Sequence, residues 1–190
     1  IKGSAGSGKT LVLAKRAVNA HLRTHKRVLV LTFNISLVNY IHDQISKVRA
    51  NFAWKNFYIT NYHSFFRESA GQYGLKITSY DDFDNRDFFS SRKDSITRYD
   101  AIFIDEIQDY KQEWLDLIVS YFSKPDTEIV VFGDEKQNIY DRELDKNKEI
   151  KVTGIVGQWN RSLKKSFRFR HNIGHLAIEF QKEFLGDKYK

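Results

Sequence analysis

The stretch "GSAGSGKT", residues 3–10, decides how the rest of the sequence is interpreted. It fits the pattern G-x-x-x-x-G-K-[ST], whose glycines let backbone N–H groups close around phosphate oxygens at the start of a helix. In this pattern Lys9 reaches the β and γ phosphates, and the hydroxyl of Thr10 is a ligand for Mg²⁺. The residues expected to bind the nucleotide are Gly3, Ser4, Ala5, Gly6, Ser7, Gly8, Lys9 and Thr10. An ordinary glycine turn is the alternative, and the amphipathic helix predicted after the loop argues against it.

Strands and helices are predicted to alternate along the rest of the chain. The first helix runs from about Lys9 to His25, with Leu11, Ala14, Val18 and Leu22 on one face. Further helices are predicted at about 35–49, 62–72, 112–122 and 172–184, and strands at 27–33, 57–60, 101–105 and 128–133. Residues 79–95 are polar and acidic at their start, which indicates a surface insertion. This alternation predicts an α/β fold, a parallel sheet flanked by helices on both faces, with ligands at the carboxyl ends of its strands.

The composition is that of one globular domain. The chain has 190 residues, of which 41% are apolar, enough for a sizeable core. No apolar run approaches the roughly 20 residues needed to cross a bilayer, so we expect a cytoplasmic protein without a membrane partner. The absence of Cys excludes disulfides and a Cys nucleophile. A net charge of +7 suits nucleic acid, and a generally basic surface explains it equally well.

The stretch "DEIQD", residues 105–109, follows a predicted strand and places two adjacent carboxylates at its end. There Asp105 can hold Mg²⁺, and Glu106 can polarise an attacking water as general base. A solvated acidic loop is the alternative, and the glycine loop makes the catalytic interpretation the stronger one. The pair alone does not explain why Gln108 and Asp109 follow it.

A third polar stretch, "GDEKQNIY" at residues 133–140, comes after the apolar strand Ile129–Phe132. Its Gln137 can form a hydrogen bond to the γ phosphate and lose it after hydrolysis, so that the position of the loop depends on the bound nucleotide. Since Gln carries no charge, we expect Gln137 to sense the nucleotide state.

The ordered set "GSAGSGKT", "LTFNISLVNYI", "TNYHSF", "DEIQD", "GDEKQNIY" and "LKKSFRF" resembles motifs I, Ia, Ib/Ic, II, III and IV of superfamily 1 helicases of the UvrD/Rep type. The resemblance implies a RecA-like P-loop NTPase domain over residues 1–160, with little or no accessory insertion. Residues 161–190 would hold motif IV and the start of the connection to a second RecA-like domain, required for full activity. The implied activity is ATP-driven movement along single-stranded DNA, with RNA left open.

The resemblance also implies roles by motif position. Lys9, Gln137 and Arg168 would contact the phosphates, Thr10 and Asp105 would bind Mg²⁺, and Glu106 would activate water. Phe167 replaces the usual Tyr that stacks on adenine and keeps an aromatic face there. Gln108 and Asp109 would couple the hydrolytic pair to motif III.

Four residues match family positions that face nucleic acid: Phe33, Asn34, His63 and Ser64. Aromatic stacking on bases and polar contacts to phosphates would give affinity with little sequence preference. Taken alone, Phe33 suits a core position, and His63 suits a histidine satisfied by local hydrogen bonds. The basic run at 161–170 suits a solvated face, kept as the interpretation for Arg161, Lys164 and Lys165.

Departures from the family pattern leave a second function open. The residues after motif III are "DREL" (141–144), where the family commonly places a base-stacking Trp, so Trp159 is a candidate substitute. The chain has no Met and opens inside an expected strand, so we expect a fragment without the second domain and its arginine finger, weak or inactive in hydrolysis. The alternative is a P-loop ATPase acting as a nucleotide-gated switch in a repair or defence complex. A nucleic-acid-binding module without turnover is a third interpretation.

Overall fold

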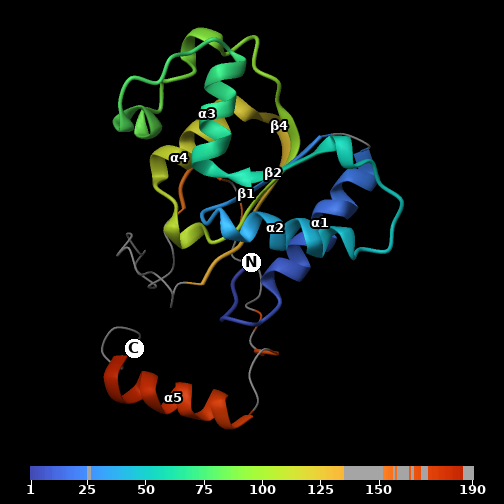
Figure 1. The fold of residues 1–190 in the computed structure, drawn as a ribbon, viewed down its shortest axis with the longest axis vertical. Helices are drawn as coiled ribbons and strands as arrows, with labels where there is room; N and C mark the ends of the chain where they lie inside the picture. The colour runs from blue at the N-terminus through green and yellow to red at the C-terminus, as the bar shows by residue number, and fades with distance from the viewer. Residues whose placement is uncertain are drawn as a thin grey trace.

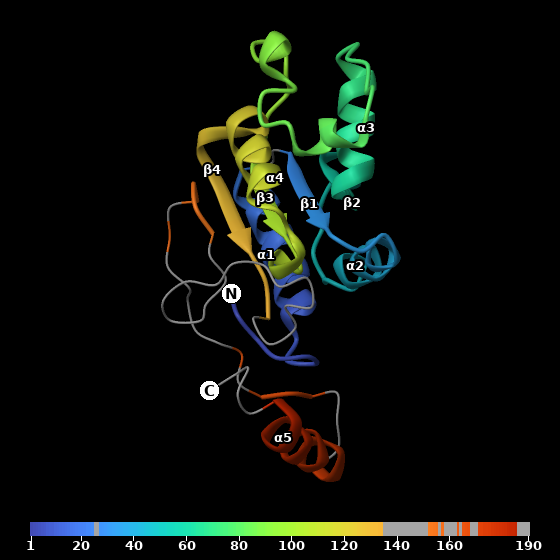
Figure 2. The same cartoon turned by 90° about the vertical axis from the view of Figure 1, so that its left-hand side faces the viewer.

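The computed structural model describes residues 1–24, 27–134, 152–155, 157, 163, 165–167 and 171–185. Its centre is a parallel sheet of four strands in the order β2-β1-β3-β4 (Figures 1 and 2). The strands are β1 (Val28–Thr32), β2 (Phe57–Asn61), β3 (Tyr99–Ile104) and β4 (Ser123–Val131). The predicted α/β fold with a parallel sheet is therefore confirmed.

The strand β1 lies between β2 and β3, and its side chains are buried along its whole length. Leu29 and Leu31 belong to one hydrophobic cluster, and Val28 and Val30 belong to the other. Successive side chains of a strand point to opposite faces of its sheet. The uninterrupted apolar run therefore reflects a sheet that is covered on both faces.

Two layers of helices cover the sheet (Figure 1). The helices α1 (Lys9–Thr24) and α2 (Ser36–Ser46) pack on the Val28 face. On the Leu29 face lie α3 (Tyr62–Gln72) and α4 (Gln112–Leu117), which continues into a π-helical turn at Ile118–Phe122. The predicted bounds of α3 agree with the structure. In α1, Ala14 and Val18 are buried as predicted, whereas Leu11 is 57% exposed, so it does not belong to the buried face.

Residues 79–95 are mostly exposed, as predicted, but two of their side chains reach the core. They form 3₁₀ turns at Tyr80–Asp84 and Ser90–Arg92, and the side chains of Phe83 and Phe89 are buried in the cluster on the Leu29 face. Polar residues of the segment face water while its phenylalanines pack inward. The segment therefore contributes to the core because burial of each Phe stabilises the fold by about 1.5–3 kcal/mol.

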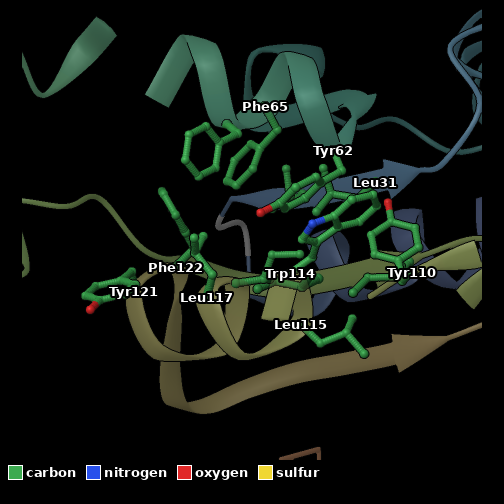
Figure 3. Packing of buried hydrophobic residues seen from close by; sticks show 14 of the residues in the cluster. Leu31, Tyr62, Phe65, Tyr110, Trp114, Leu115, Leu117, Tyr121 and Phe122 are labelled. Atoms are coloured by element: carbon green, nitrogen blue, oxygen red, sulfur yellow. The ribbon is translucent and has the colours of Figure 1, made fainter. Parts of the chain in front are cut away.

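Trp114 of α4 packs among aromatic side chains in the cluster on the Leu29 face (Figure 3). Its ring stacks on Tyr62 of α3, with centroids 4.4 Å apart and planes 11° apart. Its indole Nε1 donates a hydrogen bond of 2.7 Å to Asp84, and the Tyr62 hydroxyl donates one of 2.8 Å to the carbonyl of Phe83. One buried pair of rings thus ties α3, α4 and the segment 79–95 together.

The start of the chain extends the sheet beyond the carboxyl end of β4. Lys2 bridges to Gly133, and Gly3 bridges to Leu163, both in parallel orientation. The N–H of Gly3 donates to the carbonyl of Gly133 at 3.1 Å. This short ladder places the glycine loop at the carboxyl edge of the sheet, as predicted.

The helix α5 (His171–Leu185) lies below the layered part of the molecule in Figure 1. It exposes the apolar side chains of Ile173, Leu176, Ile178, Phe180 and Phe184. Neither α5 nor any other helix among the described residues has the length and apolar character required to cross a membrane.

Candidate functional site

The glycine loop is a compact turn whose lysine points back onto its own backbone. Gly6 and Gly8 have φ angles of 73° and 91°, a conformation that side chains other than Gly adopt rarely. The Lys9 ammonium is buried and donates to the carbonyl oxygens of Gly3 at 2.7 Å and Ser4 at 3.4 Å. Within the described part of the chain, the buried hydroxyl of Ser7 has no hydrogen-bond partner. The loop therefore presents a cation, an unused hydroxyl and a helix N-terminus, which suit an anionic phosphate chain.

Asp105 lies at the end of β3, next to the first turn of α1. Its side chain is 2% exposed, and its Oδ2 is 3.5 Å from the hydroxyl of Thr10. Burial, followed by the nearby carboxylate of Glu106, raises the pKa of Asp105 to about 7. A cation at this point would stabilise the ionised form.

This donor set fits Mg²⁺ in a nucleotide complex. In the described ranges, no group of three or more His, Asp or Glu side chains could hold a metal ion by itself. Mg²⁺ is usually bound through one or two carboxylates together with substrate phosphates and water. One hydroxyl from Thr10 and one carboxylate from Asp105 meet that requirement.

Glu106 has an unusual backbone. Its φ of 52° and ψ of 50° are left-handed, and it is the one non-glycine residue with positive φ in the described part of the chain. Such a conformation costs on the order of 1–3 kcal/mol and persists where surrounding contacts hold it. One such contact is the hydrogen bond of 3.1 Å from the Glu106 N–H to the carboxylate of Asp105.

Gln108 bridges the acidic pair and the segment that follows β4. Its amide Nε2 donates to the Glu106 carboxylate at 2.7 Å, and its Oε1 accepts from the backbone N–H of Asp134 at 3.1 Å. The side chain is 2% exposed. Both ends of the amide are therefore used, and the contact with "GDEKQNIY" expected for a coupling residue exists at Asp134.

A pocket of about 330 Å³ opens over the glycine loop. It is lined by residues 5–10 of the loop and by Leu11, Tyr40, Glu106 and Phe167. The structure thus brings together the loop, Glu106 and Phe167, and the Asp105 carboxylate lies 3.5 Å from the hydroxyl of Thr10 in the loop. The N–H of Phe167 donates to the carbonyl of Gly6 at 2.9 Å.

Tyr40 and Leu11 line the pocket, although the sequence did not predict either residue as part of the site. The spacing of the buried Ile41 and Ile45 is a signal that Tyr40 lies off the inner face of α2. That spacing carries no information on how near α2 comes to the glycine loop, which depends on its packing against α1.

The residues predicted to contact nucleic acid lie in two places around Trp114. The Phe33 ring is half-buried and lies near-parallel to Trp114, with centroids 6.2 Å apart, and the His63 ring lies 5.0 Å from the same indole. Asn34 is exposed, and its Oδ1 accepts hydrogen bonds from the N–H and the hydroxyl of Ser36. Phe33 is thus partly a core residue, the alternative that its sequence context left open.

His63 and Ser64 both have local partners. The Nε2 of His63 lies 3.1 Å from the Tyr80 hydroxyl, and burial followed by the charge of Arg67 lowers the pKa of His63. The N–H of Ser64 donates to Asn61 at 3.1 Å, and its hydroxyl accepts from the Asn61 amide at 3.0 Å, which caps α3. Local hydrogen bonds therefore account for both side chains without nucleic acid.

Three predicted residues lie outside the described residues: Gln137, Arg168 and Trp159. The basic residues Arg161 and Lys164 lie outside them as well, whereas Lys165 is described and exposed.

Comparisons with known proteins place the chain in a family. The family model AAA_19, described as "AAA domain", matches residues 1–143. No curated protein matches the chain. Among solved structures, the chain is similar to arterivirus nonstructural protein 10 (helicase) in complex with DNA, at 13% identity and a TM-score of 0.47. That similarity covers 95% of this chain and 39% of the viral chain.

Proposed function

This chain belongs to the AAA_19 family of AAA domains, and from that membership we propose that it is the ATP-binding motor domain of a superfamily 1 helicase or translocase of the UvrD/Rep type. The motor couples ATP hydrolysis to movement along single-stranded DNA. The observation that carries the proposal is the hydrogen-bonded bridge from Glu106 through Gln108 to Asp134. It joins the carboxylate proposed to activate water to the segment that follows β4.

In the proposed mechanism, the loop N–H groups and Lys9 bind the phosphates. Lys9 exchanges the carbonyl oxygens of Gly3 and Ser4 for phosphate oxygens. Thr10 and Asp105 would hold Mg²⁺, and the ion would supply positive charge that offsets the charge of the bound phosphates. Together these residues place the γ phosphate on the side of the pocket lined by Glu106.

Glu106 then orients the attacking water and accepts its proton. Its carboxylate accepts a hydrogen bond from Gln108, and its backbone is left-handed. Small movements of the γ phosphate would therefore change the geometry of a strained residue. Gln108 transmits that change to Asp134 and so to residues 135–140, which include the proposed sensor Gln137. Arg168 contacts the γ phosphate from the motif IV segment.

Single-stranded DNA would bind at the carboxyl edge of the sheet through Phe33, Asn34, His63 and Ser64. The two aromatic side chains among them contact Trp114, whose α4 follows the Gln108 segment directly. This arrangement supports a link between the acidic pair and the nucleic acid. Single-stranded RNA is the alternative ligand for the same residues.

In the proposed domain division, residues 1–160 form the RecA-like domain, and residues 161–190 begin the connection to a second one. An arginine finger from that second domain would raise the hydrolysis rate by about 10³ to 10⁵. We therefore expect weak hydrolysis from the domain alone.

A nucleotide-gated switch without strand separation is the second candidate function. The observation that favours it is that Asn34, His63 and Ser64 already have protein partners, which leaves fewer groups free for a nucleic acid. Such a switch would use the bridge from Glu106 to Asp134 to signal to a protein partner.

Steady-state ATP hydrolysis by the purified full-length protein that contains this domain, measured with and without single-stranded DNA, tests the proposal. We expect stimulation by DNA that Glu106→Gln abolishes while nucleotide binding persists. Glu113→Gln changes a half-buried glutamate of α4 that pairs with Arg86, so it is the matched control and should retain hydrolysis. Hydrolysis indifferent to DNA would favour the switch, and turnover that survives Glu106→Gln would refute the assigned chemistry.

A further inference from the structure

The pocket over the glycine loop has two kinds of wall. Backbone N–H groups, Lys9 and the carboxylate of Glu106 form the polar part. Leu11, Tyr40 and Phe167 form the apolar part, and they are 57%, 46% and 75% exposed. Three large apolar side chains therefore face water around one opening.

A nucleotide has the same division of chemistry. Its phosphates are anionic, and its base is a flat aromatic ring with polar edges. If the phosphates lie on the loop and the γ phosphate points toward Glu106, the base lies over the remaining walls, which are the exposed apolar ones. Contact with a base would remove this apolar surface from water, and aromatic rings stack favourably on nucleobases.

Both aromatic side chains come from backbone that is held close to the loop. Phe167 is tied to the loop by its N–H bond to the carbonyl of Gly6. Tyr40 directly precedes Ile41, whose buried side chain joins α2 to α1 in the core. The backbone that carries each ring is therefore held by a separate element before any ligand binds, which lowers the entropy lost on binding.

We propose that Tyr40, together with Leu11, forms a second wall of the base site and stacks on the base of a bound nucleoside triphosphate. Phe167 supplies the first wall. This inference rests on the proposed function, because it requires the phosphates to lie on the glycine loop. Tyr40 is then a residue that sets affinity for the nucleoside part of the substrate and not for its phosphates.

Calorimetric titration of the purified protein tests this with two probes, a non-hydrolysable ATP analogue and inorganic tripolyphosphate, both with Mg²⁺. We expect Tyr40→Ala to weaken binding of the ATP analogue about five- to tenfold, the low end for one aromatic–base stack because Tyr40 stays partly exposed. Binding of tripolyphosphate should be unchanged, which also shows that the loop is intact. Tyr40→Phe keeps the ring and should bind both probes as the wild type does.

Asn39→Ala is the matched control, an exposed neighbour on α2 that does not line the pocket. Equal affinity of Tyr40→Ala and wild type for the ATP analogue would overturn the inference, as would an equal loss for both probes. A loss in Tyr40→Phe as large as in Tyr40→Ala would overturn stacking. If the wild type binds neither probe, the proposed function itself fails, which is a distinct result.

Discussion

Replacement of Gln108 by Glu tests the bridge between the acidic pair and the segment after β4. The change keeps the size of the side chain and keeps an oxygen that can accept from the Asp134 N–H. It replaces the amide N–H₂ group, which now donates to Glu106 at 2.7 Å, by a carboxylate oxygen. Two acceptors would then face each other in a site where the side chain of Gln108 is 2% exposed.

The magnitude follows from the interactions lost. A hydrogen bond to a charged group contributes about 1.5–3 kcal/mol, and the new carboxylate repels its neighbour until one of them takes up a proton. We expect Gln108→Glu to lower the free energy of unfolding by about 3–4 kcal/mol at neutral pH. For a domain of this size, that corresponds to a fall in Tm of roughly 6–16 °C.

Gln112 offers a matched control. Its Nε2 donates to the Asp116 carboxylate at 2.7 Å, and its Oε1 accepts from the N–H of Thr153 at 3.1 Å, which is the same pattern in a half-buried position. Because water screens this pair, Gln112→Glu should lower stability by less than about 1 kcal/mol and leave hydrolysis intact.

Urea denaturation followed by tryptophan fluorescence measures both variants, since Trp114 is buried in the core next to this region. Hydrolysis is measured separately, in the full-length protein that contains this domain and under conditions where all variants remain folded. Gln108→Glu should be defective in both measurements. If it is no less stable than Gln112→Glu and hydrolyses ATP at the wild-type rate, the bridge from Glu106 to Asp134 has no energetic or catalytic role.

Three further predictions follow from other parts of the structure. Phe89→Ala should lower the free energy of unfolding by about 3–5 kcal/mol in urea denaturation because its side chain is fully buried, whereas a neutral result would restore the surface interpretation of residues 79–95. Lys9→Ala should abolish binding of an ATP analogue in calorimetry, and retained affinity would contradict the loop as the phosphate site. The folded state lowers the pKa of His63, so the unfolded chain takes up its proton first as pH falls and stability decreases below the ordinary histidine pKa. The urea midpoint should therefore fall less between pH 7.5 and 5.5 in His63→Gln than in the wild type. An equal fall in both proteins would contradict this role of His63.

The layered fold follows from the sequence because its central strands are buried on two faces. β1 is a continuous apolar run, and the bounds of α3 are marked by the capping residue Asn61 and by regular apolar spacing. The surface position of most of the segment 79–95 was predicted, but its two core contacts were not, because the segment has no helical or strand period. Its two buried phenylalanines, Phe83 and Phe89, are separated by polar residues and find the core only through tertiary packing.

The candidate site divides in the same way. Residues 3–10 and the acidic pair were found because their chemistry is contiguous in the sequence and repeats a known spacing. Tyr40 was not found, since its role depends on the distance between α2 and the loop. Likewise the contact of Gln108 with Asp134 joins residues 26 positions apart, and only the fold fixes its length.

The left-handed backbone of Glu106 has a consequence for protein engineering. Gly and Asn adopt that conformation with less strain, but Gly at position 106 would also leave the buried Gln108 amide without the carboxylate that accepts its hydrogen bond. Such a substitution would also remove the carboxylate that is proposed to activate water. Thermostability screens of this domain should therefore keep position 106 fixed, because the relief of backbone strain there is offset by the loss of a buried hydrogen bond and comes with the loss of the proposed general base.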